Sequence, residues 1–206
     1  DDAPALSRIC LLTGDAGKSA EELHEFGELP GLVFAVPYVE PDLPTTWAFV
    51  LQDDATGAVV GYTAGATDTR AYEAQAQARW WPRWAAVYPP ERTARPADAR
   101  YARLLREMFT ASEACLRFSP AHLHINILAA YQKQGWGRRL IARAIEHMRG
   151  EGLESVWLGM DPRNKGARAF YEKLGFEAIE GADENNVGLK FENFKAPEGS
   201  PSSATA

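Results

Sequence analysis

A glycine-rich turn between a strand-like run and a helix-like run is the part of this sequence whose residue types could do chemistry. Residues 132–139 read Gln-Lys-Gln-Gly-Trp-Gly-Arg-Arg, after an apolar run over 122–128 and at the start of a helical pattern over 138–149. Free backbone N–H groups converge at a helix N-terminus, and the helix dipole adds about half a positive charge there. Gly135 and Gly137 keep side chains away from a ligand that approaches the backbone. The turn therefore predicts a phosphate site.

Two arginines support this prediction, because Arg138 and Arg139 fall in the first turn of the helix. A cation at that place is disfavoured by about 0.3–1 kcal/mol, a cost that a bound pyrophosphate or 3′-phosphate would offset. The alternative is an ordinary surface pair of arginines, since short glycine turns often precede helices.

A second helix-like segment further along the chain carries the next candidate groups. Residues 167, 170, 171 and 174 follow helical spacing, and Gly175 is a natural C-terminal cap. Asn164 suits the start of this helix. Since Asn164 lies two turns before Tyr171, both polar side chains could line one groove.

Together the two segments resemble the GCN5-related N-acetyltransferases, in the order strand, helix, strand, helix over residues 120–192. The resemblance implies an α/β (α+β) fold with a single central mixed, mostly antiparallel sheet, a splayed parallel strand pair and flanking helices. It also implies acetyl-CoA as the acyl donor, with the pantetheine arm between the splayed strands. The residues that would bind this cofactor are Ile127, Leu128, Gln132, Lys133, Gln134, Gly135, Trp136, Gly137, Arg138, Arg139, Asn164, Ala167, Phe170 and Tyr171.

A closer resemblance extends toward the N-terminus. Residues 61–69, 80–82 and 122–128 are similar to the acetyltransferase-like domain of O-GlcNAcase and its free-standing bacterial relatives. The animal domain is suspected to be a pseudo-enzyme, whereas this chain keeps the phosphate-loop pattern. The resemblance therefore implies the bacterial branch that still binds its cofactor.

Acetyl transfer from a thioester to an amine needs a neutral amine, donors for the oxyanion and a proton for the leaving thiolate. A lysine-like amine with a pKa near ~10.4 is neutral about once in 10³ at pH 7, so a base or a desolvating pocket must act. The resemblance places Tyr171 beside the sulfur as proton donor; the alternative is a core tyrosine. The backbone N–H of Leu128 is the candidate oxyanion donor. Asn164 either contacts the pantetheine arm, as the resemblance implies, or only caps its helix.

The general base is not obvious, because Asn126 stands where close relatives often carry an aspartate, and an amide cannot accept a proton. His124 shares a strand face with Asn126 and has an unperturbed pKa near ~6.5, which suits a base. The other candidates are His122, Asp161 and Asp68. If none of them acts, the protein is an acetyl-CoA-binding module without catalysis, or a structural domain without a cofactor.

Bulk properties fit one globular domain, which we expect over residues 1–194 with its first strand absent or partial, followed by a flexible tail over 195–206. The net charge of −6 argues against nucleic acid as a partner and is compatible with an amine-bearing small molecule or a protein lysine or N-terminus. We expect no metal site, no membrane segment and a monomer or homodimer. Two distant cysteines, Cys10 and Cys115, favour a reducing, cytoplasmic setting.

The remaining pattern predicts the elements that position these groups. Residues 14–19 lack the earlier glycine of a nucleotide-binding P-loop and are expected to connect helices. Trp80, Trp81 and Trp84 are expected to pack in the core or under a lid, with an aromatic cage as the alternative. We expect helices at 5–12, 20–26, 69–87 and 97–109, an ordered coil at 29–44, and strands at 46–51, 58–66, 122–128, 155–160, 176–179 and 187–191.

Overall fold

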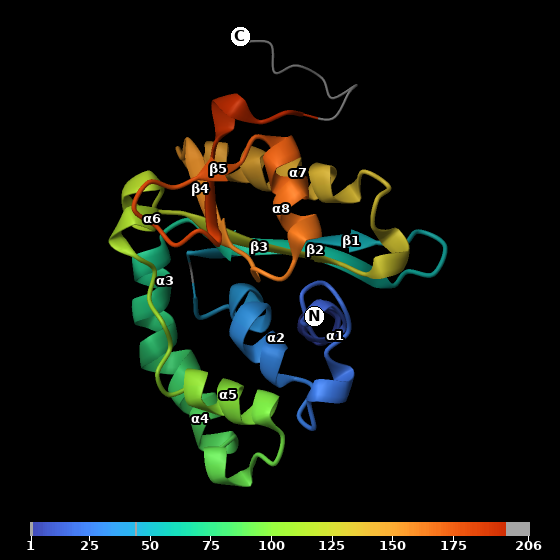
Figure 1. The fold of residues 1–206 in the computed structure, drawn as a ribbon, viewed down its shortest axis with the longest axis vertical. Coiled ribbons are helices and arrows are strands. Elements are labelled where there is room, and N and C mark those ends of the chain that lie inside the picture. Colours follow the sequence, from blue (N-terminus) through green and yellow to red (C-terminus); the bar gives the residue numbers. More distant parts are fainter. Residues whose placement is uncertain (1, 44, 197–206) are drawn as a thin grey trace.

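The computed structural model describes residues 2–43 and 45–196, which form one six-stranded mixed sheet flanked by helices (Figure 1). The strand order is β1-β2-β3-β4-β6-β5, and every neighbouring pair is antiparallel except β3 and β4, which are parallel. This arrangement confirms the predicted fold class. The strands are β1 Thr46–Gln52, β2 Val59–Ala66, β3 His122–Ile127, β4 Ser155–Gly159, β5 Glu177–Ala178 and β6 Asn186–Lys190.

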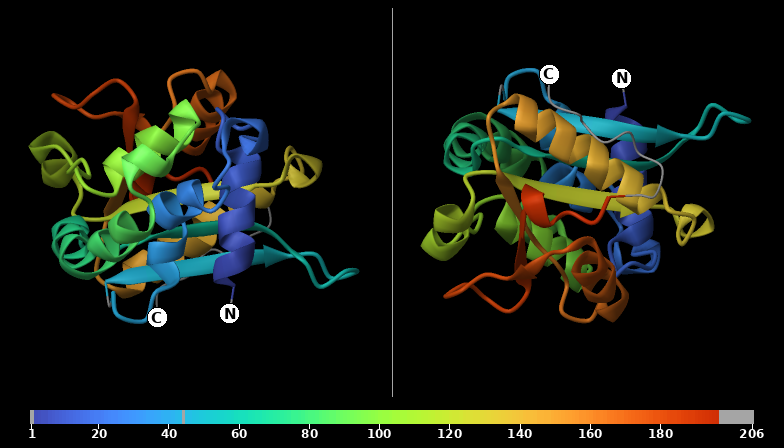
Figure 2. Two further views of the ribbon diagram at one scale, coloured as in Figure 1. Left: turned by 90° about the horizontal axis from the view of Figure 1, so that it is seen from below. Right: turned by 90° about the horizontal axis from the view of Figure 1, so that it is seen from above.

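Helices cover both faces of the sheet (Figures 1 and 2). α7 and α8 lie on one face, whereas α1 and α2 lie on the other, with α3, α4 and α5 extending beyond them. None of the helices in the described ranges combines the length and the apolarity needed to cross a bilayer. The helices are α1 Ala3–Thr13, α2 Leu29–Phe34, α3 Thr69–Gln75, α4 Trp81–Val87, α5 Pro96–Leu104, α6 Glu113–Phe118, α7 Trp136–Gly150 and α8 Lys165–Leu174.

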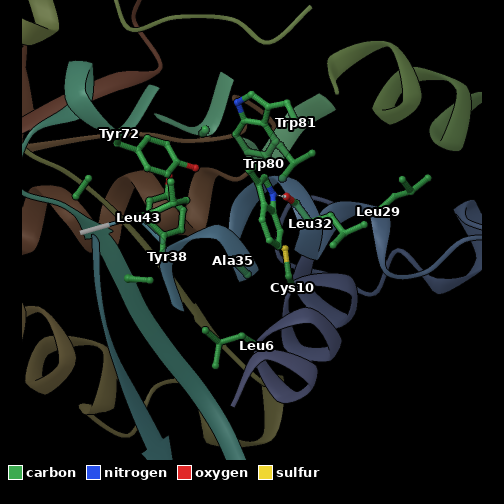
Figure 3. Packing of buried hydrophobic residues seen from close by; sticks show 14 of the residues in the cluster. Leu6, Cys10, Leu29, Leu32, Ala35, Tyr38, Leu43, Tyr72, Trp80 and Trp81 are labelled. Carbon is green, nitrogen blue, oxygen red and sulfur yellow. Dashed lines mark hydrogen bonds between the residues drawn. The ribbon is translucent and has the colours of Figure 1, made fainter. Parts of the chain in front are cut away.

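Strand alternation divides the core into two clusters, one on each face of the sheet. On the α7 and α8 face, Leu123 of β3 packs with Ile141 and Phe176. On the α1 and α2 face, Tyr62 of β2 packs with Leu6 and other residues of the cluster that Figure 3 shows. The even-numbered residues of β3 therefore belong to the α1 and α2 face, and this register decides which side chains reach the site.

The tryptophans of the α3–α4 segment are core residues, as predicted. Trp80 and Trp81 are buried, and the Trp80 indole N–H donates to the carbonyl of Leu32 at 2.8 Å (Figure 3). A π-helical turn, Ala76–Trp80, joins α3 to α4 inside the predicted 69–87 helix.

Several local predictions are wrong. The expected coil over 29–44 contains α2 and a 3₁₀ turn, Val36–Val39, because its prolines occupy first-turn positions, where their fixed φ favours a helix. The expected helix over 20–26 is only the 3₁₀ turn Glu21–Leu23.

The predicted 97–109 helix also ends early, at Leu104, and the separate helix α6 follows it. The guanidinium of Arg106 donates to the carbonyls of Ala85, Tyr88 and Ala102, so a tertiary contact fixes the chain where the periodicity would have continued.

The expectation of parallel neighbours in the second half holds for β3 and β4 but not for the last strands. β6 runs antiparallel to both β4 and β5, because the short connection between β5 and β6 cannot make a parallel crossover. The first element is α1, with no strand before it in the described residues. The predicted tail over 195–206 lies, from residue 197 onward, outside the described residues.

Candidate active site

The N-terminus of α7 is open. Gly135 occupies the N-cap position with a φ of +85°, and no side chain caps the helix. The first backbone bond of the helix runs from the Arg139 N–H to the Gly135 carbonyl at 3.2 Å, so the N–H groups of the three residues between them have no partner within the helix. A bound anion would complete this end of the helix.

Two glutamine side chains hold the turn before this helix. Gln132 Nε2 donates to the carbonyl of Ile127 at 2.8 Å, and Gln134 Nε2 donates to the carbonyl of Ala130 at 2.8 Å. Lys133 takes a left-handed conformation, with a φ of +60°. These bonds tie the turn to the end of β3 and fix the direction in which it presents its backbone.

Three cations surround the open helix end. In residues 2–43 and 45–196, Lys133, Arg138 and Arg139 form no ion pair with a carboxylate. The Arg139 guanidinium lies over the Trp136 ring, 4.7 Å from its centroid. The positive charge of this region therefore lacks a counter-ion from the chain itself.

The second glycine of the turn has a packing role. A Cβ built on Gly137 would lie 2.8 Å from Cζ of Phe170 on α8, and 3.7 Å from Cδ1 of Ile127. A side chain at this position would push α7 away from α8. Gly137 therefore sets the distance between the two helices that border the candidate site.

A cleft of about 1210 Å³ opens where β3 and β4 diverge. The two strands pair only at His122 and Trp157, so the later residues of each strand separate. The cleft wall brings together five of the predicted site residues: His124, Asp161, Asn164, Ala167 and Tyr171. The turn residues 132–139, together with Ile127, Leu128 and Phe170, lie outside this wall.

The predicted role of Leu128 as oxyanion donor is wrong. Its backbone N–H donates to the carbonyl of Val60 at 2.9 Å and so faces β2. Since the N–H groups of successive strand residues point to opposite sides, the N–H of Ile127 faces the gap toward β4 instead. The backbone donor that the gap offers is therefore one residue earlier than predicted.

Tyr171 is buried on α8 and lines the cleft. Its ring packs between Phe170 and Phe176, with a centroid distance of 5.3 Å to each. Burial raises the pKa of the Tyr171 phenol well above its ordinary value, so the group keeps its proton at neutral pH.

His122 and His124 belong to a chain of hydrogen bonds that starts at Thr69. Thr69 Oγ1 lies 2.7 Å from the Pro120 carbonyl and 2.8 Å from His122 Nδ1. A carbonyl only accepts, so the single hydroxyl proton goes to Pro120 and His122 must donate from Nδ1. His122 Nε2 then accepts from Tyr38 at 2.8 Å.

The same argument fixes the tautomer of His124. With its proton given to His122, the Tyr38 oxygen accepts a hydrogen bond from His124 Nε2, 3.0 Å away. Nδ1 of His124 is left with its lone pair. Burial lowers the pKa of His124 to about 4 and lowers that of His122 further below its ordinary range, so both rings are neutral at pH 7.

The two aspartates that we considered as bases are engaged elsewhere. Asp161 accepts from the backbone N–H and guanidinium of Arg163, and these hydrogen bonds lower the pKa of its carboxyl. Arg163 also pairs with Asp15 at 2.8 Å, linking the two sides of the cleft mouth. Asp68 caps α3 by accepting from the Ala71 N–H and is not part of the cleft wall.

The two asparagines are oriented by hydrogen bonds of different kinds. Asn164 caps α8, since its Oδ1 accepts from the N–H of Ala167 at 3.0 Å. Asn126 donates from Nδ2 to the hydroxyl of Thr13 in α1. Both side chains also line the cleft.

Sequence reasoning did not name the residues that form the opposite wall of the cleft. Thr13, Phe34, Tyr38 and Tyr101 line it from α1, α2, the following 3₁₀ turn and α5. The aromatic, proline-rich composition of residues 29–44 was the available signal, but it shows no periodicity that would aim a ring at β3.

Known proteins share both the sequence pattern and the fold. The family model for the acetyltransferase (GNAT) family matches residues 20–176. The solved structure of SsHAT is 33% identical, covers 93% of this chain and 94% of its own, and superposes with a TM-score of 0.78. The chain therefore belongs to the acetyltransferase (GNAT) family.

Other relatives match over part of their length or by fold alone. The ribosomal protein bS18-alanine N-acetyltransferase of Haemophilus influenzae is 35% identical over 57 residues, which are 28% of this chain and 38% of that enzyme. Mycothiol acetyltransferase of Kocuria rhizophila is 50% identical over 46 residues, 22% of this chain and 15% of that enzyme. The chain thus spans well under two thirds of these curated relatives. The PaiA N-acetyltransferase of Thermoplasma acidophilum, solved with coenzyme A, shares the fold at 12% identity, with a TM-score of 0.53 over 92% of each chain.

Proposed function

We propose that this protein is an N-acetyltransferase that moves the acetyl group of acetyl-CoA to a primary amine by direct attack in a ternary complex. The observation that carries the proposal is the open N-terminus of α7. Its unbonded N–H groups and the three unpaired cations beside it form a site for the phosphates of the cofactor. Membership of the GNAT family supports the same conclusion.

The residues present fit this cofactor from one end to the other. The N–H groups after Gly135 would bind the diphosphate, while Lys133, Arg138 and Arg139 supply positive charge. The pantetheine arm would enter the gap between β3 and β4, which pair only at His122 and Trp157. Ala167 is small and lies in the wall of that gap.

We assign the proton transfers to two side chains. His124 is the candidate base, because His122 uses both ring nitrogens in hydrogen bonds and Asp161 is held by Arg163. His124 Nδ1 would take the amine proton once the nitrogen has bonded to the acetyl carbon. Tyr171 would give its proton to the thiolate as the carbon–sulfur bond breaks. The N–H of Ile127 would stabilise the oxyanion.

The second candidate function is an acetyl-CoA-binding module that senses or recognises without catalysis. Two observations favour it: Asn126 cannot take a proton, and burial makes His124 a weak base by lowering its pKa to about 4. Such a module would bind acetyl-CoA as tightly as an enzyme but would release no coenzyme A.

We propose a cytoplasmic setting and a bacterial source, as the sequence prediction has it. The free, buried thiols of Cys10 and Cys115 support the cytoplasmic setting. The acceptor that we propose is an amine-bearing small molecule or a protein lysine or N-terminus. The specific relationship to the O-GlcNAcase domain stays a prediction.

The test pairs binding with turnover. Titration with acetyl-CoA should shift the amide NMR signals of Gly135, Trp136, Gly137 and Arg138, and a panel of primary amines should then release free thiol. Saturating acetyl-CoA that leaves these four amides unchanged would overturn the cofactor assignment. Binding with no thiol release from any amine would favour the sensing module.

A further inference from the structure

The side chain of Asn126 is hydrogen-bonded to Thr13, whose hydroxyl can only accept from it. Thr13 Oγ1 lies 2.7 Å from the carbonyl of Ile9 and within hydrogen-bond distance of the Asn126 amide. The hydroxyl has one proton, and the Ile9 carbonyl can only accept it. If the Asn126 oxygen faced Thr13, two acceptor oxygens would compete for that proton. The Asn126 NH₂ must therefore face Thr13.

This orientation leaves the Asn126 oxygen for a ligand. Asn126 and Thr13 both line the cleft, and Thr13 is buried. Oδ1 of Asn126 has no hydrogen-bond partner within the part of the chain that the structure describes, nor is it among the side-chain atoms sealed away from solvent. Amide orientation follows from the surrounding hydrogen bonds, and here a single bond decides it.

A second acceptor stands two residues away on the same strand face. His124 and Asn126 are two residues apart on the same face of β3, so their Cα atoms lie about 7 Å apart. His124 retains its Nδ1 lone pair because the Thr69–His122–Tyr38 chain places its proton on Nε2. The strand therefore presents two hydrogen-bond acceptors, His124 Nδ1 and Asn126 Oδ1. The bond to Tyr38 fixes the first as an acceptor, and the bond to Thr13 fixes the second.

We propose that the Asn126 oxygen, oriented by Thr13, is a positioning and specificity-determining group that accepts one N–H of the acceptor amine while His124 accepts the other. This inference rests on the proposed function. A primary amine has two N–H hydrogens and a lone pair, so it satisfies both acceptors and still aims its lone pair at the thioester carbon. A secondary amine or an alcohol has one hydrogen and leaves one acceptor unmatched, which costs affinity. The amide at position 126 thus selects the acceptor instead of removing its proton.

Substitutions at both ends of the Thr13–Asn126 bond test the proposal. Asn126→Ala should raise the KM for the amine about 10-fold and leave the KM for acetyl-CoA unchanged. Thr13→Val keeps the shape but removes the hydroxyl, so the amide can turn over, and the amine KM should rise about 3-fold. Thr13→Ser is the matched control, because it keeps the hydroxyl and should keep the wild-type amine KM. Thermal melting of each variant separates loss of fold from loss of the hydrogen bond.

A binding measurement tests the same assignment without turnover. The side-chain NH₂ signals of Asn126, identified by their absence in Asn126→Ala, are followed in the coenzyme A-bound protein. Phenethylamine, N-methylphenethylamine and 2-phenylethanol are the probes, since they share the phenethyl group and, in their neutral forms, carry two, one and one hydrogens on the nitrogen or oxygen. We expect the NH₂ signals to shift with phenethylamine and to shift several-fold less with the other two. Equal shifts from all three, or no shift with phenethylamine, would overturn the proposal.

The two proposals fail in different ways. If phenethylamine shifts the Asn126 signals but no amine releases thiol, the transferase function fails and the amine site stands. If amines release thiol but Asn126→Ala leaves the amine KM unchanged, the transferase stands and the role of Asn126 is overturned.

Discussion

The helices α7 and α8 lie on the same face of the sheet, but their N-termini are capped in opposite ways (Figure 1). α7 begins at Gly135, with no capping side chain and with unpaired cations beside it. α8 begins at Asn164, whose own oxygen accepts from the Ala167 N–H. The first helix end leaves its donors for a ligand, and the second satisfies them within the chain. The two helix starts therefore differ in whether a side chain caps them.

The same contrast extends to the rest of the site. Along the cleft floor, Thr69, His122, Tyr38 and His124 satisfy one another in a continuous chain, and Thr13 holds Asn126. In the turn at residues 132–135, only the side chains of the two glutamines form hydrogen bonds, each to a backbone carbonyl. The polar groups of the floor are bonded to one another, whereas the N–H groups at the start of α7 have no partner within the helix.

The largest expected effect is the pH dependence of the free energy of unfolding, which we attribute to His124 in the hydrogen-bonded cleft floor. Because the folded protein lowers the pKa of His124 to about 4 from about 6.5, the unfolded state binds more protons between these values. The free energy of unfolding should therefore fall as the pH drops from 7 to 4, with His124 contributing on the order of 3 kcal/mol. Urea unfolding across this range measures it. His124→Gln keeps a donor toward Tyr38, and its free energy of unfolding should fall about 3 kcal/mol less between pH 7 and pH 4 than that of the wild type. An equal fall in both proteins would show that the fold does not keep His124 neutral.

Tyr171→Phe should affect turnover alone. Removing the phenolic proton should lower kcat by about 100-fold, because the thiolate then leaves without a proton. The affinity for acetyl-CoA should stay unchanged, since Tyr171 lies two turns along α8 from its N-cap residue, Asn164. Tyr131→Phe, which removes a half-buried hydroxyl bonded to Asp53 outside the cleft, is the control. A kcat within 2-fold of wild type would remove Tyr171 from the mechanism.

Gly135→Val tests the open helix end. A Cβ at this position meets no atom within 4 Å, but the φ of +85° is strained for a β-branched residue. Strain of about 1–3 kcal/mol should pull the turn out of position and weaken acetyl-CoA binding by at least 10-fold, measured by calorimetry. Gly150→Ala lies in the same helix, with open space and no positive φ, and should bind as the wild type does. Equal affinities for the two variants would mean that the turn does not hold the phosphates.

Asn164→Ala tests the closed helix end and has the smallest expected effect. Losing the cap should lower the free energy of unfolding by about 1 kcal/mol, measured by urea denaturation. If capping is its main role, the affinity for acetyl-CoA should change less than 2-fold. Asn164→Asp, which keeps an accepting oxygen, should restore stability. A large loss of acetyl-CoA affinity in Asn164→Ala would instead support the predicted contact with the pantetheine arm.

The sequence by itself was enough to locate the glycine turn before α7, the two helices that flank the gap and the strand that carries His124 and Asn126. These features are local, because glycines, cap residues and periodicity act within a few residues of one another. It also showed correctly that Trp80 and Trp81 belong to the core.

Only the tertiary structure decided what the polar atoms of the site can do. Which side of β3 the Leu128 N–H faces depends on pairing with Val60, far away in the chain. The tautomer of His124 depends on Tyr38 and Thr69, and the orientation of the Asn126 amide depends on Thr13, a residue of the first helix. Proton positions are set by partners that only folding brings within 3 Å or so of each other, and no spacing along the chain encodes them.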